Sequence, residues 1–286
     1  MTLATTSELI SAAAASGRAI AAFNVLSLDH AEAVAAGAAS VGSPALLQIS
    51  ENAIAFRGSP EPLLAACREI AAASDAPLGI HLDHIEDPRL VARVLANATE
   101  FGVGSIMFDA SKLDYADNVA ATRDVVARAH DAGVWVEAEL GEIGGKDGAH
   151  APGVRTDPGE AAAFVEATGV DGLAVAVGSS HAMLDRSAQL DLELIARLAE
   201  AVPVPLVLHG SSGVADEVIA AAVASGIRKV NVGTALNIAF TASLREALSA
   251  QPDAVDPRRY TRDARAGMVA LVGRFCTVVA GARQPA

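Results

Sequence analysis

Short apolar segments rich in Val, Ile and Leu alternate eight times along this chain with Ala-rich segments of helical periodicity. The apolar segments are Ala19–Val25, Ala45–Ser50, Leu78–Asp83, Ser105–Ala110, Val134–Leu140, Leu173–Gly178, Leu206–Gly210 and Lys229–Gly233. The helical segments are Asp29–Val41, Glu61–Ala73, Pro88–Phe101, Ala116–Ala132, Gly159–Ala167, Leu192–Ala201, Asp216–Ala224 and Leu236–Ser249. Several apolar segments are apolar on both faces, which is typical of buried parallel strands. Eight consecutive strand–helix units predict an α/β fold whose parallel strands close into a (β/α)8 barrel.

The rest of the chain predicts one further element and no domain break. A helix over Pro257–Val279 follows the eighth unit, and no strand comes after it. The pairs Asp87-Pro88 and Asp157-Pro158 mark helix starts, because proline fits the first turn of a helix and aspartate caps it. No linker or low-complexity tract interrupts the series. Residues 1–286 are therefore predicted to form a single TIM-barrel domain with an extra C-terminal helix.

Charge and composition exclude several classes of protein. A formal net charge of −13, with no cluster of Lys or Arg, opposes binding to nucleic acid or to anionic membranes. An anionic substrate therefore needs a local positive site, such as a metal ion or a helix N-terminus. The chain has no uncharged apolar run long enough for a membrane span and no basic start typical of a signal peptide, so we expect a cytoplasmic protein. Cys67 and Cys276 lie in helical segments and are expected to be buried free thiols.

Polar side chains gather at the predicted carboxyl ends of the strands, where barrels of this kind carry their active sites. Three of them, His84, His181 and His209, are histidines at the ends of separate apolar segments. A lone histidine on such a strand is more often a hydrogen-bonded core residue, which is our expectation for His81. Three at equivalent strand ends instead predict a metal site, because three imidazoles leave zinc an open position where it can act as a Lewis acid.

Asp83 precedes one of these histidines and is the candidate for moving a proton to or from a substrate hydroxyl. Side chains alternate along a strand, so Asp83 and His84 can both face the site only if the strand gives way to a loop there. The following stretch, Ile85-Glu-Asp-Pro88, is compatible with such a loop.

Two glycine-containing turns, His209-Gly-Ser-Ser-Gly213 and Asn231-Val-Gly-Thr234, end the predicted seventh and eighth strands and precede helices. Phosphate groups commonly bind at this end of a barrel through backbone N–H groups and helix N-termini. The two turns are therefore predicted to hold a phosphate group.

Seven stretches spread over nearly the whole chain carry a family resemblance. They are Ala22-Phe-Asn-Val, Leu82-Asp-His, Val136-Glu-Ala-Glu-Leu-Gly-Glu-Ile-Gly-Gly145, Leu173-Ala-Val-Ala-Val-Gly, Pro205-Leu-Val-Leu-His-Gly-Ser-Ser-Gly213, Lys229-Val-Asn-Val-Gly-Thr234 and Asp256-Pro-Arg-Arg-Tyr260. Through them the chain resembles the class II, zinc-dependent fructose-bisphosphate and tagatose-bisphosphate aldolases. The resemblance implies a lyase of carbohydrate metabolism, including glycolysis, built as a homodimer or homotetramer. Such an enzyme reversibly cleaves fructose 1,6-bisphosphate, tagatose 1,6-bisphosphate or a related ketose 1-phosphate to dihydroxyacetone phosphate and an aldehyde such as glyceraldehyde 3-phosphate.

The resemblance also implies roles for individual residues. The implied ligands of one Zn²⁺ per subunit are His84, His181 and His209, and the implied alternative metal position is formed by Asp109 and Glu139. A monovalent cation, Na⁺ or K⁺, is a further implied cofactor. Asp83 is implied as the residue that transfers the proton at the C4 oxygen. The residues implied in binding substrate or its phosphate are Asn24, Ser50, Gly178, Gly210, Ser211, Ser212, Asn231, Gly233, Thr234 and Arg258. In some members the arginine that Arg258 matches reaches the substrate phosphate of a neighbouring subunit.

Two stretches depart from the family pattern. The family usually has His-Gly-x-Tyr after the second zinc histidine, with the glycine backbone serving the phosphate, whereas this chain has His181-Ala182-Met183-Leu184. The loop after the fifth strand usually carries Gly-Gly-x-Glu, whose glutamate handles the C3 proton, whereas this chain has Gly144-Gly-Lys-Asp-Gly148. Asp147, Glu142 and His150 are the alternatives for that role, and the sequence does not choose among them.

Two other functions compete with this interpretation. A Schiff-base aldolase needs a lysine inside the barrel, but Lys229 is expected at the wrong end of the eighth strand, and Lys112 and Lys146 in loops. A catalytically silent, metal-containing regulatory protein that binds sugar phosphates would keep the barrel and the metal, although it would have no need of Asp83. The sequence leaves open which ketose phosphate is cleaved and whether the assembly is a dimer or a tetramer.

Overall fold

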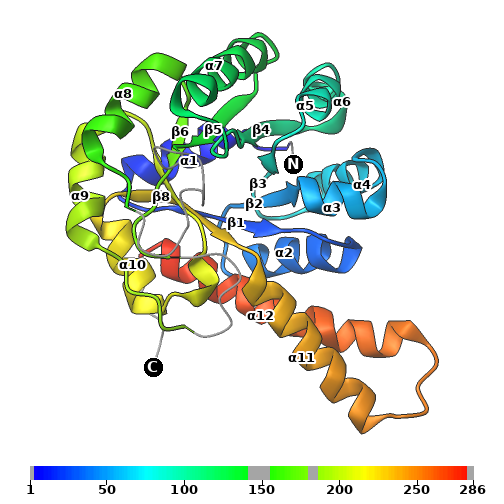
Figure 1. Ribbon diagram of the computed structural model, residues 1–286. Coiled ribbons are helices and arrows are strands. Elements are labelled where there is room, and N and C mark those ends of the chain that lie inside the picture. The colour runs from blue at the N-terminus through cyan, green and yellow to red at the C-terminus, as the bar shows by residue number, and fades with distance from the viewer. Residues whose placement is uncertain (1–2, 141–154, 180–185, 282–286) are drawn as a thin grey trace.

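The computed structural model describes residues 3–140, 155–179 and 186–281, and its centre is a closed barrel of eight parallel strands (Figure 1). The strands are β1 (Ile20–Asn24), β2 (Ala45–Ser50), β3 (Leu78–Ile85), β4 (Val103–Phe108), β5 (Trp135–Glu139), β6 (Gly172–Ala174), β7 (Leu206–Leu208) and β8 (Ile227–Val232). Each strand pairs in parallel with the next one in the chain, and β8 closes the ring on β1. The predicted (β/α)8 barrel is confirmed.

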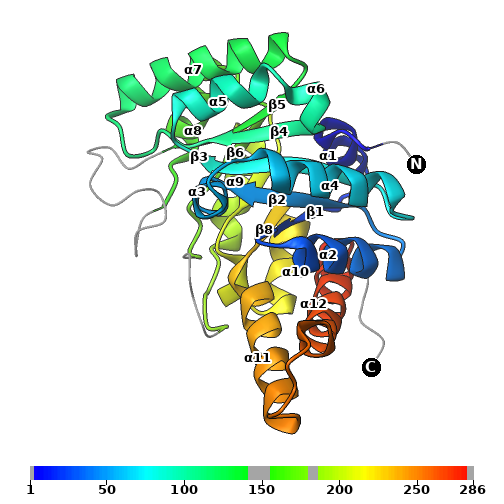
Figure 2. The same cartoon turned by 90° about the vertical axis from the view of Figure 1, so that its right-hand side faces the viewer.

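Helices form a layer around the barrel (Figures 1 and 2). They are α1 (Thr6–Ala15), α2 (Leu28–Ser40), α3 (Glu51–Arg57), α4 (Glu61–Ala73), α5 (Pro88–Leu95), α6 (Ala98–Phe101), α7 (Tyr115–Asp131), α8 (Pro158–Thr168), α9 (Leu192–Ala201), α10 (Asp216–Ser225), α11 (Thr234–Ala250) and α12 (Pro257–Val279), with a short 3-10 turn, η1 (Ser211–Gly213). The extra C-terminal helix is confirmed as α12. The continuous helix expected over Pro88–Phe101 is wrong, because α5 ends at Leu95 and a separate turn, α6, follows.

The Asp-Pro helix starts are confirmed by their capping geometry. The Asp87 carboxylate accepts a hydrogen bond from the Arg89 backbone N–H at 2.8 Å, at the start of α5. The Asp157 carboxylate accepts from the N–H groups of Gly159 and Glu160 at the start of α8. Each aspartate thereby satisfies amides that have no partner within their own helix.

Helix α1, which the strand–helix alternation did not predict, closes the barrel at the amino-terminal ends of the strands. Thr5 and Glu8 form a capping box at its start, and the Ala4 N–H donates to the carbonyl of Leu78, the first residue of β3. The helix packs its apolar face onto side chains from the lower end of the barrel. This cluster consists of Leu9, Ile10, Ala13, Ile20, Ala22, Leu46 and Trp135. The barrel therefore opens at its carboxyl-terminal end.

Helices α11 and α12 form a hairpin that projects from the barrel (Figures 1 and 2). In α11 only Leu236 is buried, whereas the second half of α12 is anchored on the barrel, where Phe275 packs edge-on against Phe23 of β1. Arg258 lies in the first turn of α12, at the outer end of this hairpin, and its side chain is 89% exposed.

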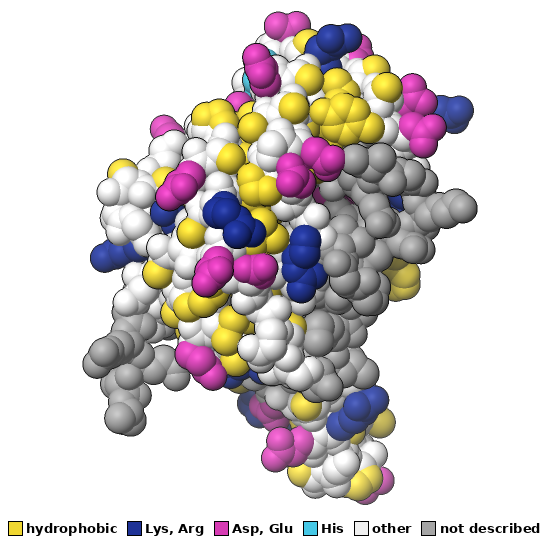
Figure 3. Space-filling view, turned by 60° about the vertical axis from the view of Figure 1, so that its left-hand side comes forward, with side chains coloured by type: hydrophobic (Ala, Val, Ile, Leu, Met, Phe, Trp, Pro, Cys, Tyr) yellow, Lys and Arg dark blue, Asp and Glu magenta, His cyan; other side chains and the backbone are white. Residues whose placement is uncertain are grey.

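Cys67 and Cys276 are buried free thiols, as expected, and burial raises the pKa of each to about 12. Among the described residues, no helix has the length and apolar character needed to cross a membrane. On the face shown in Figure 3, Lys and Arg side chains are interspersed with Asp and Glu and form no basic patch.

We predict that Gly172→Ala destabilises the lower end of the barrel by about 1–3 kcal/mol, because a Cβ at this position would lie 2.3 Å from the indole of Trp135 and the core would be overpacked. Urea unfolding followed by circular dichroism measures the change. Gly104→Ala is the matched control in β4, since its nearest contact would be an ordinary 3.4 Å. Equal stability of the two variants would show that the indole has room to move.

Candidate active site

The last residues of β3 bring Asp83 and His84 to the same site. The sequence suggested that the strand gives way to a loop at this point. It does not, because β3 continues to Ile85. Instead the pairing of β3 with β4 shifts register between Leu82 and Ile85, and His84 has φ of 48°, in the left-handed region. A bulge of this kind re-aims the extra side chain, so consecutive residues can face the site together. His84 is the one non-glycine residue with positive φ in the described ranges, and such strain is typical of functional sites.

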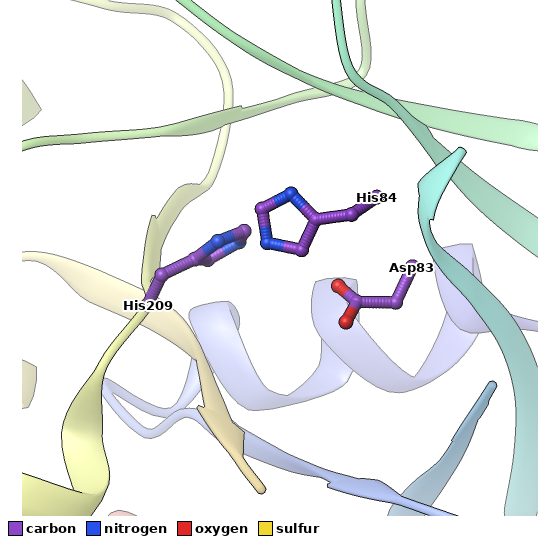
Figure 4. Close-up of side chains that lie close together, drawn as sticks. All are labelled: Asp83, His84 and His209. Atoms are coloured by element: carbon purple, nitrogen blue, oxygen red, sulfur yellow. The ribbon is translucent and has the colours of Figure 1, made fainter. Parts of the chain in front are cut away.

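Asp83, His84 and His209 form a cluster at the open end of the barrel. Figure 4 shows their side chains pointing toward one another from β3 and from the end of β7, and one possible ligand atom from each lies within 4.8 Å of the others. The two imidazole rings meet edge to face with centroids 4.9 Å apart. His181, the third histidine of the expected set, lies outside the described residues.

A second group of possible ligands shares His84. Its Nδ1 lies 2.8 Å from Asp109 Oδ2, and ligand atoms of His84, Asp109 and Glu139 lie within 4.8 Å of one another. Burial opposes a charge on His84, but the negative charge of Asp83 and the hydrogen bond to Asp109 outweigh it and raise the pKa of His84 to about 10. Burial likewise disfavours ionisation of Asp109, yet its hydrogen bond to His84 holds the pKa of Asp109 well below the usual range.

These residues fit a divalent metal ion. Imidazole nitrogens and carboxylate oxygens are ligands that zinc accepts. The negative potential that keeps a proton on His84 would equally stabilise a cation in its place. Two of the three expected histidine ligands, His84 and His209, thus lie together, and the expected alternative pair, Asp109 and Glu139, adjoins the same His84 imidazole.

A buried ion pair lies beneath this cluster, inside the barrel. Lys229 Nζ donates to Glu137 Oε2 at 2.7 Å, and both side chains are fully buried. As expected, Lys229 lies away from the carboxyl end of its strand, as the third residue of β8, but its side chain points inward and reaches Glu137 on β5. Its ammonium is held by a carboxylate and lines neither of the cavities described below, so it is no Schiff-base nucleophile.

The ion pair orients the residues above it. Glu137 Oε1 lies 2.8 Å from His209 Nε2, so that nitrogen carries the proton and Nδ1 is the nitrogen available to a metal. Lys229 also donates to Asn231 Oδ1 at 2.8 Å, which turns the Asn231 amide nitrogen toward Asp83 Oδ1 at 3.3 Å. Lys229 thereby orients His209 through Glu137. It also orients the Asn231 amide, which lies beside Asp83, the candidate acid–base residue.

Below Lys229 the hydrogen bonds continue to α1. Burial and the charge of Lys229 lower the pKa of His81 well below the usual range, so His81 is neutral. Lys229 lies 3.3 Å from His81 Nε2, and His81 Nδ1 lies 2.8 Å from Ser105 Oγ, which bonds Thr6 Oγ1 at 2.6 Å. His81 is therefore a hydrogen-bonded core residue, as expected.

A cavity of about 300 Å³ opens between β1, β2, β3, β7 and β8 above these residues. Its lining contains Asn24, Leu26, Gln48, Ser50, Asp83, His84, Gly210, Ser212, Asn231, Gly233, Thr234 and Asn237. Seven of the ten residues expected to bind substrate line this cavity. An eighth, Ser211, lies just beneath it, and its hydroxyl donates to the Asn231 carbonyl at 2.5 Å.

Two expected residues do not reach this cavity. Gly178 lies beyond the end of β6, with φ of 119°, against the Gln189 carbonyl. Arg258 lies at the tip of the hairpin, where its guanidinium binds Asp256. Ala182, Glu142, Asp147 and His150 are outside the described residues.

Sequence reasoning missed Gln48, Asn237 and the role of Lys229. Gln48 lies two residues before Ser50 on β2 and shares its face, which is the signal that alternation along the strand offered. Its amide donates to Asn24 Oδ1 at 3.1 Å, and the Asn24 amide in turn donates to Asp83 Oδ2 at 3.4 Å. Asp83 therefore accepts hydrogen bonds from two asparagines, each oriented by a donor behind it.

Comparisons with known proteins give the family and the fold. The profile of the family described as Fructose-bisphosphate aldolase class-II matches residues 4–284. The YdjI aldolase from Escherichia coli K12 is 30% identical, with 97% of each chain covered and a TM-score of 0.83. A protein from Coccidioides immitis provisionally described as a fructose-1,6-biphosphate aldolase is 29% identical, with 96% of each chain covered and a TM-score of 0.82. Fructose-bisphosphate aldolase from Campylobacter jejuni, 23% identical over 95% of this chain and 94% of its own, shares the fold with a TM-score of 0.82.

We predict that Lys229→Met costs about 3–5 kcal/mol of stability, because it leaves the Glu137 carboxylate buried without its partner. The double variant Lys229→Met/Glu137→Gln should recover a large part of this loss, since the buried charge is removed as well. Urea unfolding of the four proteins in the double-mutant cycle measures the coupling.

Lys112→Met is the matched control, because Lys112 and Glu86 form a largely exposed ion pair whose loss should cost at most about 1 kcal/mol. A double variant no more stable than Lys229→Met would contradict the account, as would an equal loss in the control.

Proposed function

Because this chain belongs to the class II fructose-bisphosphate aldolase family, we propose that it is a zinc-dependent aldolase acting on a ketose phosphate. The reaction reversibly cleaves fructose 1,6-bisphosphate, tagatose 1,6-bisphosphate or a related ketose 1-phosphate to dihydroxyacetone phosphate and an aldehyde such as glyceraldehyde 3-phosphate. The observation that carries the proposal is the convergence of Asp83, His84 and His209 beside a polar cavity at the open end of the barrel. A metal site and an acid–base group adjoin there, as carbon–carbon cleavage requires.

We assign one Zn²⁺ per subunit to His84, His181 and His209, with Asp109 and Glu139 as an alternative position and Na⁺ or K⁺ as a further ion. Bound zinc would supply a Lewis acid for the substrate carbonyl. The ligand choice is supported by Glu137, which leaves His209 Nδ1 facing the cluster, and by the carboxylates that attract a cation to His84.

Asp83 is the proposed acid–base residue. In the cleavage direction it takes the proton of the C4 hydroxyl as the C3–C4 bond breaks, and the electron pair of that bond stays on the dihydroxyacetone phosphate portion until C3 is protonated. In condensation Asp83 returns the proton to the C4 oxygen. Asn24 and Asn231 hold its two oxygens from opposite sides, so the carboxylate is oriented before substrate arrives.

The phosphate of the dihydroxyacetone phosphate portion is proposed to bind where β7 and β8 end. The described lining of this part of the cavity contains no Lys or Arg, so binding relies on Gly210, Ser212, Gly233 and the N-terminus of α11. Ser212 Oγ accepts from the Ala235 N–H at 3.0 Å and joins the two loops. A negatively charged protein can hold an anion here through amides and the helix dipole.

We further propose a cytoplasmic homodimer or homotetramer. The exposed α11–α12 hairpin supports self-association, because it presents Ile238, Leu248 and Val255 at 44%, 38% and 92% exposure. Arg258 lies too far out on this hairpin to line its own cavity, so any contact with substrate would be made in a second subunit.

Removal of the metal should abolish cleavage of ketose phosphates, and Zn²⁺ should restore it. Because the pKa of His84 is about 10 without metal, zinc binding at neutral pH should also release a proton. Isothermal titration calorimetry in buffers of different ionisation enthalpy measures that release. Full turnover after chelation, or a borohydride-trapped imine, would refute the metal-dependent route.

Asp83→Ala should lower kcat by about 10²–10⁴-fold, the usual contribution of a general acid–base residue. Zinc content should remain, because the proposed ligands are unchanged. Steady-state cleavage assays and metal analysis of the same preparation provide both readouts. A variant that turns over like the parent would move the proton-transfer role to another group.

A further inference from the structure

The open end of the barrel holds two cavities that meet at the reacting centre. The first, of about 300 Å³, is the one described above, and the second, of about 630 Å³, adjoins α3 and the end of β3. The four residues common to both linings are Asn24, Ser50, Asp83 and His84. A ketose that is cleaved beside Asp83 must place one product in each cavity, so the lining of each decides which product fits.

The phosphate-side cavity, the first of the two, suits an anion. Apart from the shared Asp83 and His84, its lining consists of amides, hydroxyls, glycines and one leucine, with no further ionisable side chain among the described residues. It also contains the start of the 17-residue helix α11 at Thr234, where the helix dipole favours negative charge.

The aldehyde-side cavity, the second, has the opposite character. The residues that only this cavity contributes are Glu51, Asn52, Glu86 and Lys112. The ammonium of Lys112 is already bound to Glu86 Oε1 at 2.5 Å. Glu51 accepts from the backbone N–H groups of Glu86 and Asp87 at 2.7 and 3.0 Å. Two carboxylates against one ammonium give the part of the described lining that only this cavity contributes a negative charge, whereas Asp83 and His84 are common to both cavities and do not distinguish them.

Arg258, at the tip of the α11–α12 hairpin, does not offset the negative charge of the aldehyde-side cavity. Arg258 forms an ion pair with Asp256, since its guanidinium contacts both oxygens of that carboxylate at 2.7 and 3.1 Å. Delivered by a neighbouring subunit, the pair would bring almost no net charge.

From this asymmetry we infer that the substrate carries a single phosphate. It is a ketose 1-phosphate whose aldehyde product is an uncharged polyhydroxy aldehyde. A phosphate dianion in the aldehyde-side cavity would face Glu51 and Glu86, whereas hydroxyl groups can donate to these carboxylates and pair with Asn52. This inference rests on the proposed function and narrows it to one of the two substrate classes left open there.

The test compares two acceptors in condensation with dihydroxyacetone phosphate on the zinc-loaded enzyme. We expect kcat/KM to be at least about 10-fold higher with glyceraldehyde than with glyceraldehyde 3-phosphate, since each 1.4 kcal/mol of discrimination is a factor of ten. Glu86→Gln removes one carboxylate and frees Lys112, so it should raise the phosphorylated-to-unphosphorylated ratio of kcat/KM by about 10-fold. Glu166→Gln, the same change at an exposed position on α8, should leave the ratio unaltered.

The outcomes distinguish a failure of the single-phosphate substrate from a failure of the proposed function. A preference for glyceraldehyde 3-phosphate in the parent, or an equal ratio in Glu86→Gln and Glu166→Gln, would overturn the single-phosphate substrate while the aldolase activity stands. Condensation with neither aldehyde, together with no exchange of the C3 proton of dihydroxyacetone phosphate into heavy water, would overturn the proposed function itself and this inference with it.

Discussion

The ion pair of Lys229 and Glu137 holds the interior of the barrel in the arrangement on which the candidate site depends. Two opposite charges at the centre of a barrel, each without access to solvent, have to satisfy one another and their remaining hydrogen bonds. They do so by engaging His209 on one side, Asn231 on another and His81 below. The orientation of a possible metal ligand and of the amide beside Asp83 therefore depends on residues that the substrate does not touch.

The same electrostatic reasoning explains how an acidic protein can act on an anionic substrate. Carboxylates surround His84, which makes the reacting centre attractive to a cation rather than to a phosphate. Favourable surroundings for the phosphate are confined to the ends of β7 and β8, where backbone amides and the start of α11 replace cationic side chains. The surroundings that favour a cation and those that favour a phosphate thus lie at different positions along the bound sugar.

The sequence predicted the barrel and most of the cavity because both follow from local patterns. Apolar segments and Asp-Pro caps mark the strand–helix units, and polar residues at strand ends converge once the strands are parallel. The bulge at His84 could not be predicted, since positive φ is uncommon for any non-glycine residue and is associated here with the register shift in the pairing with β4. The inward direction of the Lys229 side chain could not be predicted either, because it depends on Glu137, which is 92 residues away in the chain. Helix α1 is specified by the apolar lower end of the barrel rather than by the strand–helix repeat.

The closure of the lower end by α1 has an optical consequence. Trp135 is the single tryptophan of the chain, is 9% exposed and packs in the cluster beneath α1, on the side of the barrel away from the cavities. Its emission wavelength and quenching therefore report whether α1 is packed against the barrel. Intrinsic fluorescence reports on the lower end of the barrel, so ligand binding at the open end is better followed by another signal, such as heat, absorbance or an extrinsic dye.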